Sequence, residues 1–353
     1  MNNDSTTTHT AVATTHTQDP HLAELEQKES VFTKIFNTNL GDHHGLYVFD
    51  YHVADLPYIF YDKETGLQIY TSEHSLEAAG AYELHHGHPI VKARYETQLH
   101  TGKTSKEALK VAKPALDLSV TNLVAYQWFG ILLLSLGFFL AARKYKRNPM
   151  KPPSGLQNLL EVLIQFVRDD IVRPNMPSVK IADGLTGYFV ALFSFILILN
   201  ILGLLPGGHP AAGAVGTTAA LAITAFLVIN ITAFRVAGVK AWFSHLLGGA
   251  PWWLAPIMVP IEIVGLFSKP FALMVRLFAN MSAGHIVIFS LVGLIFFFET
   301  LLVAPVSVGF VVFIYFLETL VALLQAFIFT ILTAVFAGLA IGDHGHDDHA
   351  AAH

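Results

Sequence analysis

The chain has 353 residues, of which 53% are hydrophobic and only 13% are charged, and its net charge at pH 7 is −5. Soluble domains carry roughly 25% charged residues, so this composition excludes an ordinary soluble protein, and the negative charge gives no support for nucleic-acid binding. The chain contains no cysteine, which excludes disulfides and cysteine-ligated zinc. Nucleotide-binding, serine-hydrolase and zinc-protease motifs are missing too, so the sequence predicts a chain that needs no cofactor and is not an enzyme by itself.

Residues 1–120 form a polar, histidine-rich extension that we expect to be partly disordered. Its first 30 residues contain almost nothing apolar to bury, which is typical of disorder. Residues 31–100 combine aromatic side chains with turn signals, and predict a small, partly ordered unit outside the membrane. A lysine-rich stretch, residues 103–113, predicts a helix that approaches the membrane. The eleven histidines before residue 101 have no clean metal-ligand spacing, so we expect them to be solvated rather than to bind a metal.

The first predicted transmembrane helix covers Asn122 to Ala142, which is 21 residues. About 20 residues are needed to cross ~30 Å of hydrocarbon. The basic stretch RKYKRNPMK follows at once, and favours a cytoplasmic position for that end. Between Leu156 and Val172, apolar residues recur at helical spacing with charged residues among them. This pattern predicts an amphipathic helix that lies along the membrane surface.

Two further spans, residues 185–205 and 211–234, are predicted to form a hairpin, because only a short Pro/Gly-rich link separates them. The ninety residues from Trp252 to Ile341 contain five charged side chains and one credible break, near residues 299–305. Each half would measure ~60 Å as a helix, too long to stand upright in a ~30 Å core. We therefore expect an all-α membrane protein with about five transmembrane helices, the last two long and strongly tilted or kinked at proline. Residues 342–353 form a polar His/Asp tail.

The last two segments carry ionisable residues that are candidates for ion handling. A charge at mid-membrane costs at least ~2.5–3.5 kcal/mol, which makes Arg276 a functional candidate. Asn280 lies one helical turn further on the same face, whereas His285 is nine residues away and faces roughly the opposite side. On the final segment, Glu318 and Gln325 are seven residues apart and share a face. An antiparallel pairing of the two helices could place Glu318 beside His285 as a titratable pair.

Structural explanations of these residues stay open at this point. Arg276 could extend to a headgroup or pair with a structural acid, His285 could be an ordinary core histidine, and Glu318 could be a structural buried acid.

The segment GLFSKPFALMVRLFANMSAGH, followed by TLVALLQAFIFTILTAVF, closely resembles subunit a of the F-type ATP synthases, the stator subunit that faces the rotating c-ring. LILNILGLLP is similar to the middle hairpin of that family. The resemblance covers residues 120–341, so it implies a membrane domain of this type over residues 121–341.

The resemblance also implies roles for individual residues. Arg276 matches the essential arginine, and the further positions that match polar residues of the proton path are Asn280, Gln325, Glu262 and Asn200. His285 stands where many bacterial members carry an acid, and Glu318 stands where they carry a histidine, so the two residue types are exchanged here. The chain departs from the family at Gly203, where some members carry Asp, and in its long N-terminal extension.

The implied function is proton translocation through two half-channels that load and unload c-ring carboxylates, with Arg276 preventing a leak between them. The implied partners are the c-ring, the peripheral stalk b subunits, the rest of the ATP synthase and membrane lipid, in a bacterial inner membrane. Either H⁺ or Na⁺ fits the sequence. The alternatives are a secondary ion transporter or channel with its own ion site, which predicts internal repeats that we do not find, and a membrane-anchored scaffold, which would leave Arg276 without purpose.

Overall fold

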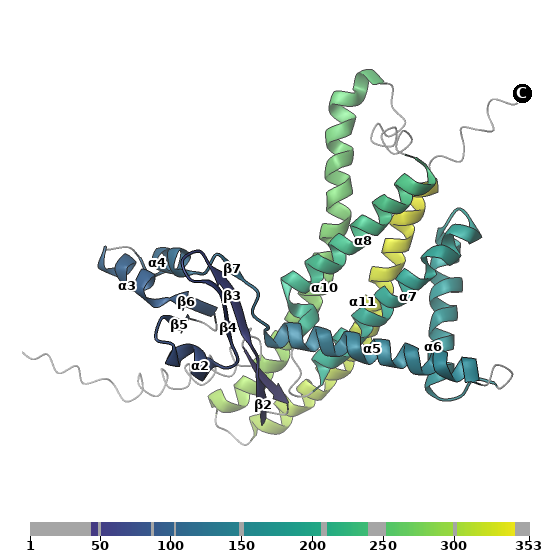
Figure 1. Ribbon diagram of the computed structural model, residues 1–353. Helices are drawn as coiled ribbons and strands as arrows, with labels where there is room; N and C mark the ends of the chain where they lie inside the picture. The colour runs from purple at the N-terminus through teal and green to yellow at the C-terminus, as the bar shows by residue number, and fades with distance from the viewer. Residues whose placement is uncertain are drawn as a thin grey trace, which may run out of the picture.

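The computed structural model describes residues 44–48, 51–85, 88–101, 104–147, 152–205, 210–238, 252–298 and 302–342. A small N-terminal unit of strands and short helices lies at one end of a group of long helices (Figure 1). Within the described ranges, five helices are long and apolar enough to cross a membrane. They are α5 (Asn122–Arg147), α7 (Val179–Leu204), α8 (Val215–Val236), α10 (Ala255–Phe298) and α11 (Val303–Gly342). The five predicted spans are confirmed.

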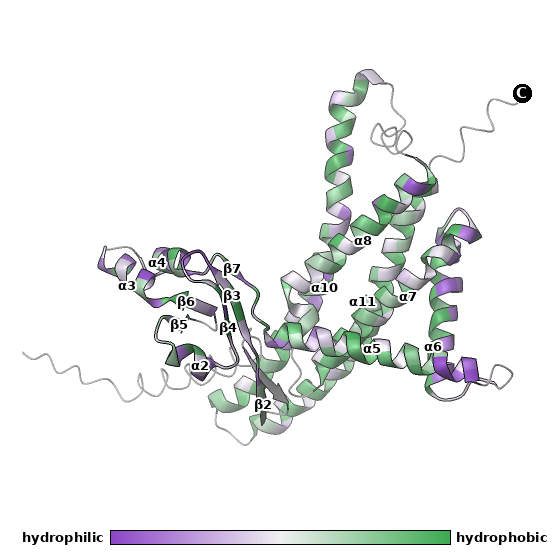
Figure 2. Cartoon of the chain, in the orientation of Figure 1, coloured by the Kyte–Doolittle hydropathy of each residue, from purple (hydrophilic) through white to green (hydrophobic). Residues whose placement is uncertain are grey.

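Helix α5 is apolar along most of its length, and only 6% of its most hydrophobic window is buried in the protein (Figure 2). Such an all-round apolar surface suits contact with lipid. Its basic C-terminal end is tied to the segment that follows: Lys144 Nζ donates to the Ser154 carbonyl oxygen at 2.9 Å, and the Tyr145 hydroxyl donates to Glu161. These polar contacts mark one membrane surface.

The predicted amphipathic helix is present as α6 (Leu156–Gln165), continued by the π-helical η1 (Phe166–Val172) and the 3-10 turn η2 (Arg173–Asn175). In Figure 1, α6 lies across the end of α5 rather than continuing in its direction. This is the arrangement of a helix that lies along the surface crossed by α5. One side of η1 is buried in the bundle, since Val167 and Ile171 have no exposed surface.

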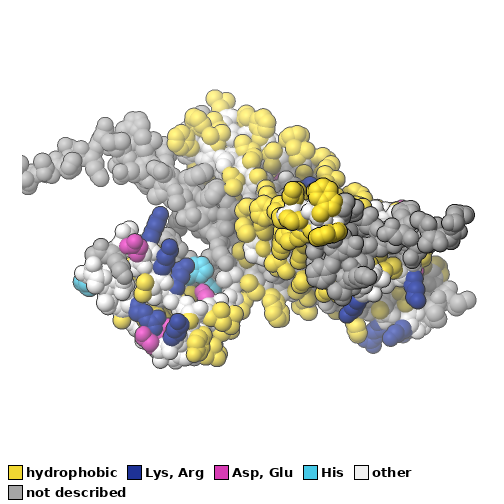
Figure 3. Space-filling view, turned by 90° about the horizontal axis from the view of Figure 1, so that it is seen from above, with side chains coloured by type: hydrophobic (Ala, Val, Ile, Leu, Met, Phe, Trp, Pro, Cys, Tyr) yellow, Lys and Arg dark blue, Asp and Glu magenta, His cyan; other side chains and the backbone are white. Residues whose placement is uncertain are grey.

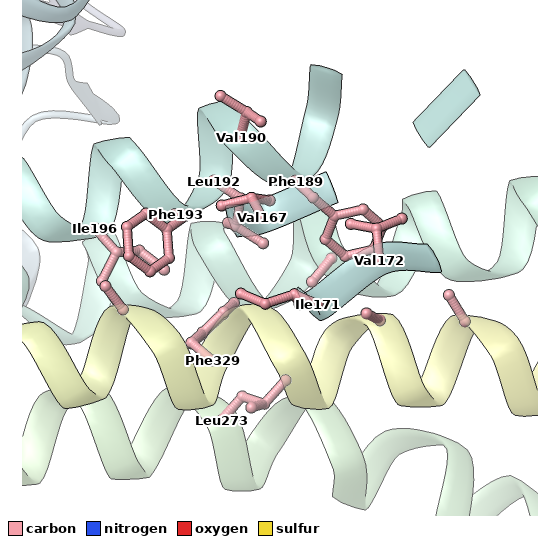
Figure 4. Packing of buried hydrophobic residues seen from close by; sticks show 14 of the residues in the cluster. Val167, Ile171, Val172, Phe189, Val190, Leu192, Phe193, Ile196, Leu273 and Phe329 are labelled. Atoms are coloured by element: carbon pink, nitrogen blue, oxygen red, sulfur yellow. The ribbon is translucent and has the colours of Figure 1, made fainter. Parts of the chain in front are cut away.

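The core of the membrane part joins η1 to four of the long helices, α7, α8, α10 and α11 (Figure 4). Phe189 and Phe193 of α7, Phe329 of α11 and Leu273 of α10 meet the η1 valines and isoleucine there. Lipid tails are as apolar as these side chains, so close packing rather than hydrophobic transfer holds such helices together. Buried alanines and close-packed glycines permit that packing; Gly338 of α11 lies directly against the backbone of η2.

Helices α10 and α11 form an antiparallel hairpin of 44 and 40 residues. At 1.5 Å per residue, each is roughly 60–65 Å long, about twice the hydrocarbon thickness. Helix α10 runs unbroken through Pro260 and Pro270, so neither proline divides it. In Figure 1, neither helix runs along the direction of α5; their tilt in the membrane stays a prediction.

The N-terminal unit contains β-strands, which the sequence did not lead us to expect. Its strands pair as three antiparallel sets: β1 (Gly45–Val48) with β2 (Tyr51–Asp55); β3 (Tyr58–Asp62) between β4 (Gly66–Tyr70) and β7 (Leu116–Asp117); and β5 (Tyr82–His85) with β6 (His88–Val91). Three short helices accompany them, α2 (Glu73–Ala78), α3 (Lys92–His100) and α4 (Ser105–Ala112). The lysine-rich stretch is helical, as predicted, and forms α4. Strand β7 follows α4 and leads into α5.

A small aromatic core and one buried ion pair hold this unit together. The core consists of Tyr58, Phe60, Leu76 and Tyr82. Asp62 is 1% exposed and accepts two hydrogen bonds from the Arg94 guanidinium, at 2.7 and 2.9 Å. The hydrogen bond from Arg94 holds the pKa of the Asp62 carboxyl below its usual value despite burial.

Candidate ion-translocation site

Arg276 lies midway along α10 and is exposed on the outside of the helical bundle. Its neighbours on that surface are apolar; Phe271 and Val275 of α10 are exposed with it. Among the described residues, Arg276 has no ion-pair or hydrogen-bond partner. Because arginine keeps its charge in proteins, this is a permanent cation on the outside of a helix that is long and apolar enough to cross a membrane, where a charge is costly without an anionic partner.

A small cavity of about 20 Å³ lies beside this surface, between α7, α10 and α11. Its polar lining comes from Asn280, one turn after Arg276, and from Asn200, Glu318 and Gln325. Asn200 is 1% exposed and donates through Nδ2 to the Ala322 carbonyl oxygen at 3.1 Å, while its Oδ1 has no partner among the described residues. A space of this size holds about one water molecule, so the cavity can carry a hydrogen-bonded water among these groups.

His285 is buried on the other side of α10 from Arg276, as the nine-residue spacing predicted. Its Nδ1 lies 2.9 Å from the Met281 carbonyl oxygen and its Nε2 lies 3.0 Å from the Gly203 carbonyl oxygen. Carbonyl oxygens only accept hydrogen bonds, so both contacts are hydrogen bonds only when the ring carries two protons. A neutral ring donates through only one of these two nitrogens.

Glu318 of α11 lies against Gly284, the residue before His285. Both carboxylate oxygens are buried and have no hydrogen-bond partner among the described residues. The α10–α11 hairpin thus brings Glu318 to the residue next to His285, as expected for an antiparallel arrangement; that the two form a titratable pair stays a prediction. A buried carboxylate without hydrogen bonds is costly, which makes Glu318 a candidate functional residue.

Gly203 of α7 lies in close contact with α10 and with the segment that follows α7. A Cβ at position 203 would lie 2.5 Å from the Met281 Cε and 3.1 Å from the Pro210 Cα, which leaves no room for a side chain without repacking. The backbone carbonyl oxygen of Gly203 is an acceptor for His285 Nε2.

Glu262 lies in a second cavity, away from the cluster around Glu318. This cavity has a volume of about 60 Å³ and lies between α8, α10 and the end of α11. Lys269 and Asn230 line it together with Glu262, and Lys269 Nζ is 5.5 Å from the centre of the Phe336 ring. Sequence reasoning gave no role to Lys269 or Asn230. The seven-residue spacing of Glu262 and Lys269, which places them on one helix face, was the signal that could have found this group.

Comparison with known proteins points to one family. The family model described as ATP synthase A chain matches residues 124–338. The ATP synthase subunit a of Chloroherpeton thalassium is 45% identical over 245 residues, which cover 69% of this chain and 73% of that protein. The subunit a of Myxococcus xanthus is 42% identical, over 66% of this chain and 77% of that protein.

One match extends further into the N-terminal half. The ATP synthase subunit a of Chlorobium phaeobacteroides is 39% identical over 279 residues, covering 78% of this chain and 81% of that protein. This is more of the chain than residues 124–338, so the likeness is not confined to the membrane helices. With five membrane-spanning helices and these bacterial relatives, the chain is a multi-pass protein of the bacterial inner membrane and belongs to the ATP synthase A chain family.

Proposed function

We propose that this chain is the proton-translocating stator subunit of the membrane sector of an F-type ATP synthase. In this role it exchanges protons with carboxylates on a rotating c-ring and couples their flow to rotation. The observation that carries the proposal is Arg276, a permanent cation exposed midway along α10 with no partner among the described residues. A facing carboxylate that arrives and leaves would supply the anion that this position requires.

Arg276 prevents a leak because of its place between two polar regions of α10. Glu262 precedes it by fourteen residues, about 21 Å along the helix, and His285 follows by nine residues, about 13 Å. We assign one half-channel to the cavity with Glu262, Lys269 and Asn230, and the other to the cluster with His285 and Glu318. A fixed positive charge between them repels a proton that would pass directly, so the proton must travel with the ring.

The polar groups support a proton path on the Glu318 side. The orphaned oxygens of Asn200 and Glu318 line a cavity with room for about one water, together with Asn280 and Gln325. The His285–Glu318 pair can pass a proton along this path, since imidazole and carboxylate both exchange protons at accessible pH. Each elementary charge that moves through 100 mV releases about 2.3 kcal/mol, and coupling requires that this energy reach the ring.

The chain acts in a complex and is not an enzyme by itself. The partners that we propose are the c-ring on the Arg276 surface, the peripheral stalk b subunits and the ATP-hydrolysing head. We divide the chain into an extension (1–120), the membrane domain (121–341) and a polar tail (342–353). The first boundary is supported by the change from strand β7 to helix α5, and by the start of the family match at residue 124.

The proposal is tested by purification from native membranes in mild detergent. We expect a ring of small carboxylate-bearing subunits and a water-soluble ATPase to copurify with the chain. A chain that purifies alone, and that conducts ions by itself in vesicles, would instead be a secondary transporter or channel.

A further inference from the structure

The outer face of the sheet β4-β3-β7 carries two rows of apolar side chains. Leu67, Tyr61 and Leu116 pair across the three strands in one row. The next row holds Ile69, paired with Ile59, and Leu118, whose amide donates to the Ile59 carbonyl oxygen at 2.8 Å. Residues paired across antiparallel strands point to the same face of the sheet, so these six side chains form one surface.

This surface is exposed, although it is apolar. All its members except the half-buried Ile59 are between 47% and 61% exposed. The other face of the sheet is the covered one, since Tyr58 and Phe60 pack there against Leu76 of α2. Antiparallel sheets with one covered face ordinarily carry polar residues on the other. A continuous apolar patch of this kind marks a surface that meets an apolar partner.

The connection to α5 places this patch at the membrane surface. Residues Leu123 to Ala142 are apolar and span about 30 Å as a helix, and the basic residues from Arg143 onward mark the far headgroup layer. The near end of the hydrocarbon therefore lies close to Leu123. The carbonyl of Thr121 accepts the first hydrogen bond of α5. Leu118 lies three residues before Thr121, which is at most about 10 Å of extended chain. The headgroup layer is itself about 5–8 Å thick.

The same link is rigid rather than free. The Val120 amide donates to the Pro57 carbonyl oxygen at 3.0 Å, and His44 Nδ1 lies 3.0 Å from the Val120 carbonyl oxygen. The sheet therefore follows the orientation of the start of α5. In Figure 3, hydrophobic side chains gather on the part of the N-terminal unit nearer the spanning helices.

We propose that the outer face of this sheet rests on the lipid bilayer around the first span. Its aliphatic side chains enter the boundary between headgroups and acyl chains, and Tyr61 sits at the headgroup level, where tyrosine is enriched. The face thereby fixes the N-terminal unit against the membrane surface opposite to α6. This role is independent of proton transfer, and it requires only that α5 crosses the bilayer.

The absence of cysteine from the chain permits a direct test by single-site labelling. Leu67→Cys and Ile69→Cys place a fluorescent label on the face, and Glu77→Cys, exposed on α2 beyond the covered side, is the matched control. Each variant is labelled in the assembled complex and reconstituted in phosphatidylcholine–phosphatidylglycerol vesicles. The label is then quenched either by a nitroxide on the lipid, near the headgroup, or by iodide in water.

We expect the lipid nitroxide to quench the labels at positions 67 and 69 at least threefold more than the label at position 77, and iodide to show the reverse order. Equal quenching at all three positions would place the face in water and overturn the proposal. Labels at 67 and 69 that neither quencher reaches would also overturn it, because protein would then cover the face. Repeating the experiment without residues 1–43 would show whether that segment is the cover. ATP-driven proton pumping by each variant checks that assembly is intact.

Discussion

Gly284 makes room for the Glu318 side chain, and the change Gly284→Ala tests whether the position of that carboxylate matters for ion movement. A Cβ at position 284 would overlap the Glu318 carboxylate and would lie 3.0 Å from its Cγ. Because the Cγ is also too close, bending the end of the side chain does not relieve the contact. Glu318 must change rotamer, or the two helices must separate.

The expected loss of pumping rate follows from these two ways of relieving the overlap. Alanine stabilises a helix by ~0.8–1 kcal/mol relative to glycine, so the change does not weaken α10 itself. Overpacking of a close contact costs ~1–3 kcal/mol. If translocation needs Glu318 in its present position beside His285, that penalty must be overcome in each transfer, and it corresponds to a ~5- to 150-fold lower rate.

The assay is ATP-driven proton uptake by vesicles that contain the assembled complex. Gly137→Ala in α5 is the matched control, since a Cβ there meets no atom within 4 Å, and it should pump at the unaltered rate. Assembly is checked by the amount of the complex recovered from the membrane. Full pumping by an assembled Gly284→Ala variant would refute the claim that this contact positions Glu318 for transfer.

Three further outcomes are expected. The exchange His285→Glu with Glu318→His should retain more proton pumping than either single change in a double-mutant cycle; additive losses would mean that the two residues act independently. Arg94→Ala leaves the buried Asp62 unpaired and should destabilise the N-terminal unit by about 3 kcal/mol, measured by hydrogen exchange of its strands, and unchanged protection would refute this. Because the pKa of Asp62 is lowered in the folded protein, its carboxylate stabilises the unit above the unfolded pKa of about 4, and this stability is lost as pH falls through the folded pKa. The effect of acid on hydrogen exchange should therefore be smaller in Arg94→Ala than in the wild type. Deletion of residues 1–100 should leave ATP-driven pumping largely intact once the chain inserts and assembles, and a truncated complex that assembles without conducting protons would place the extension in the ion path.

The sequence was sufficient for the membrane architecture, because lipid imposes strong rules on it. Long apolar runs between charged ends predicted the start of α5 at Asn122 and the break between α10 and α11. The spacing of His285 from Arg276 predicted opposite faces of one helix, and the hairpin then brings Glu318 against the residue before His285. These inferences needed only helix periodicity and the cost of a charge in lipid.

The features that the sequence did not reveal depend on contacts between distant segments. Strand β7 pairs with β3 through Phe60 and Asp117, and no local pattern in either segment indicates a partner so far along the chain. The bond from Asn200 to the Ala322 carbonyl oxygen and the contact of Gly284 with Glu318 likewise depend on how helices meet. Periodicity assigns a residue to a face, whereas its partner is decided by tertiary packing.

The central claim is that Arg276 is required for proton translocation, and ATP-driven proton pumping by the Arg276→Ala complex tests this claim most directly. Because the arginine has no partner among the described residues, its removal should leave folding and assembly intact, yet abolish pumping. Arg276→Lys should not restore full activity, because lysine is a more strongly hydrated point charge that loses its proton readily when buried. Normal proton pumping by an assembled Arg276→Ala complex would contradict the account.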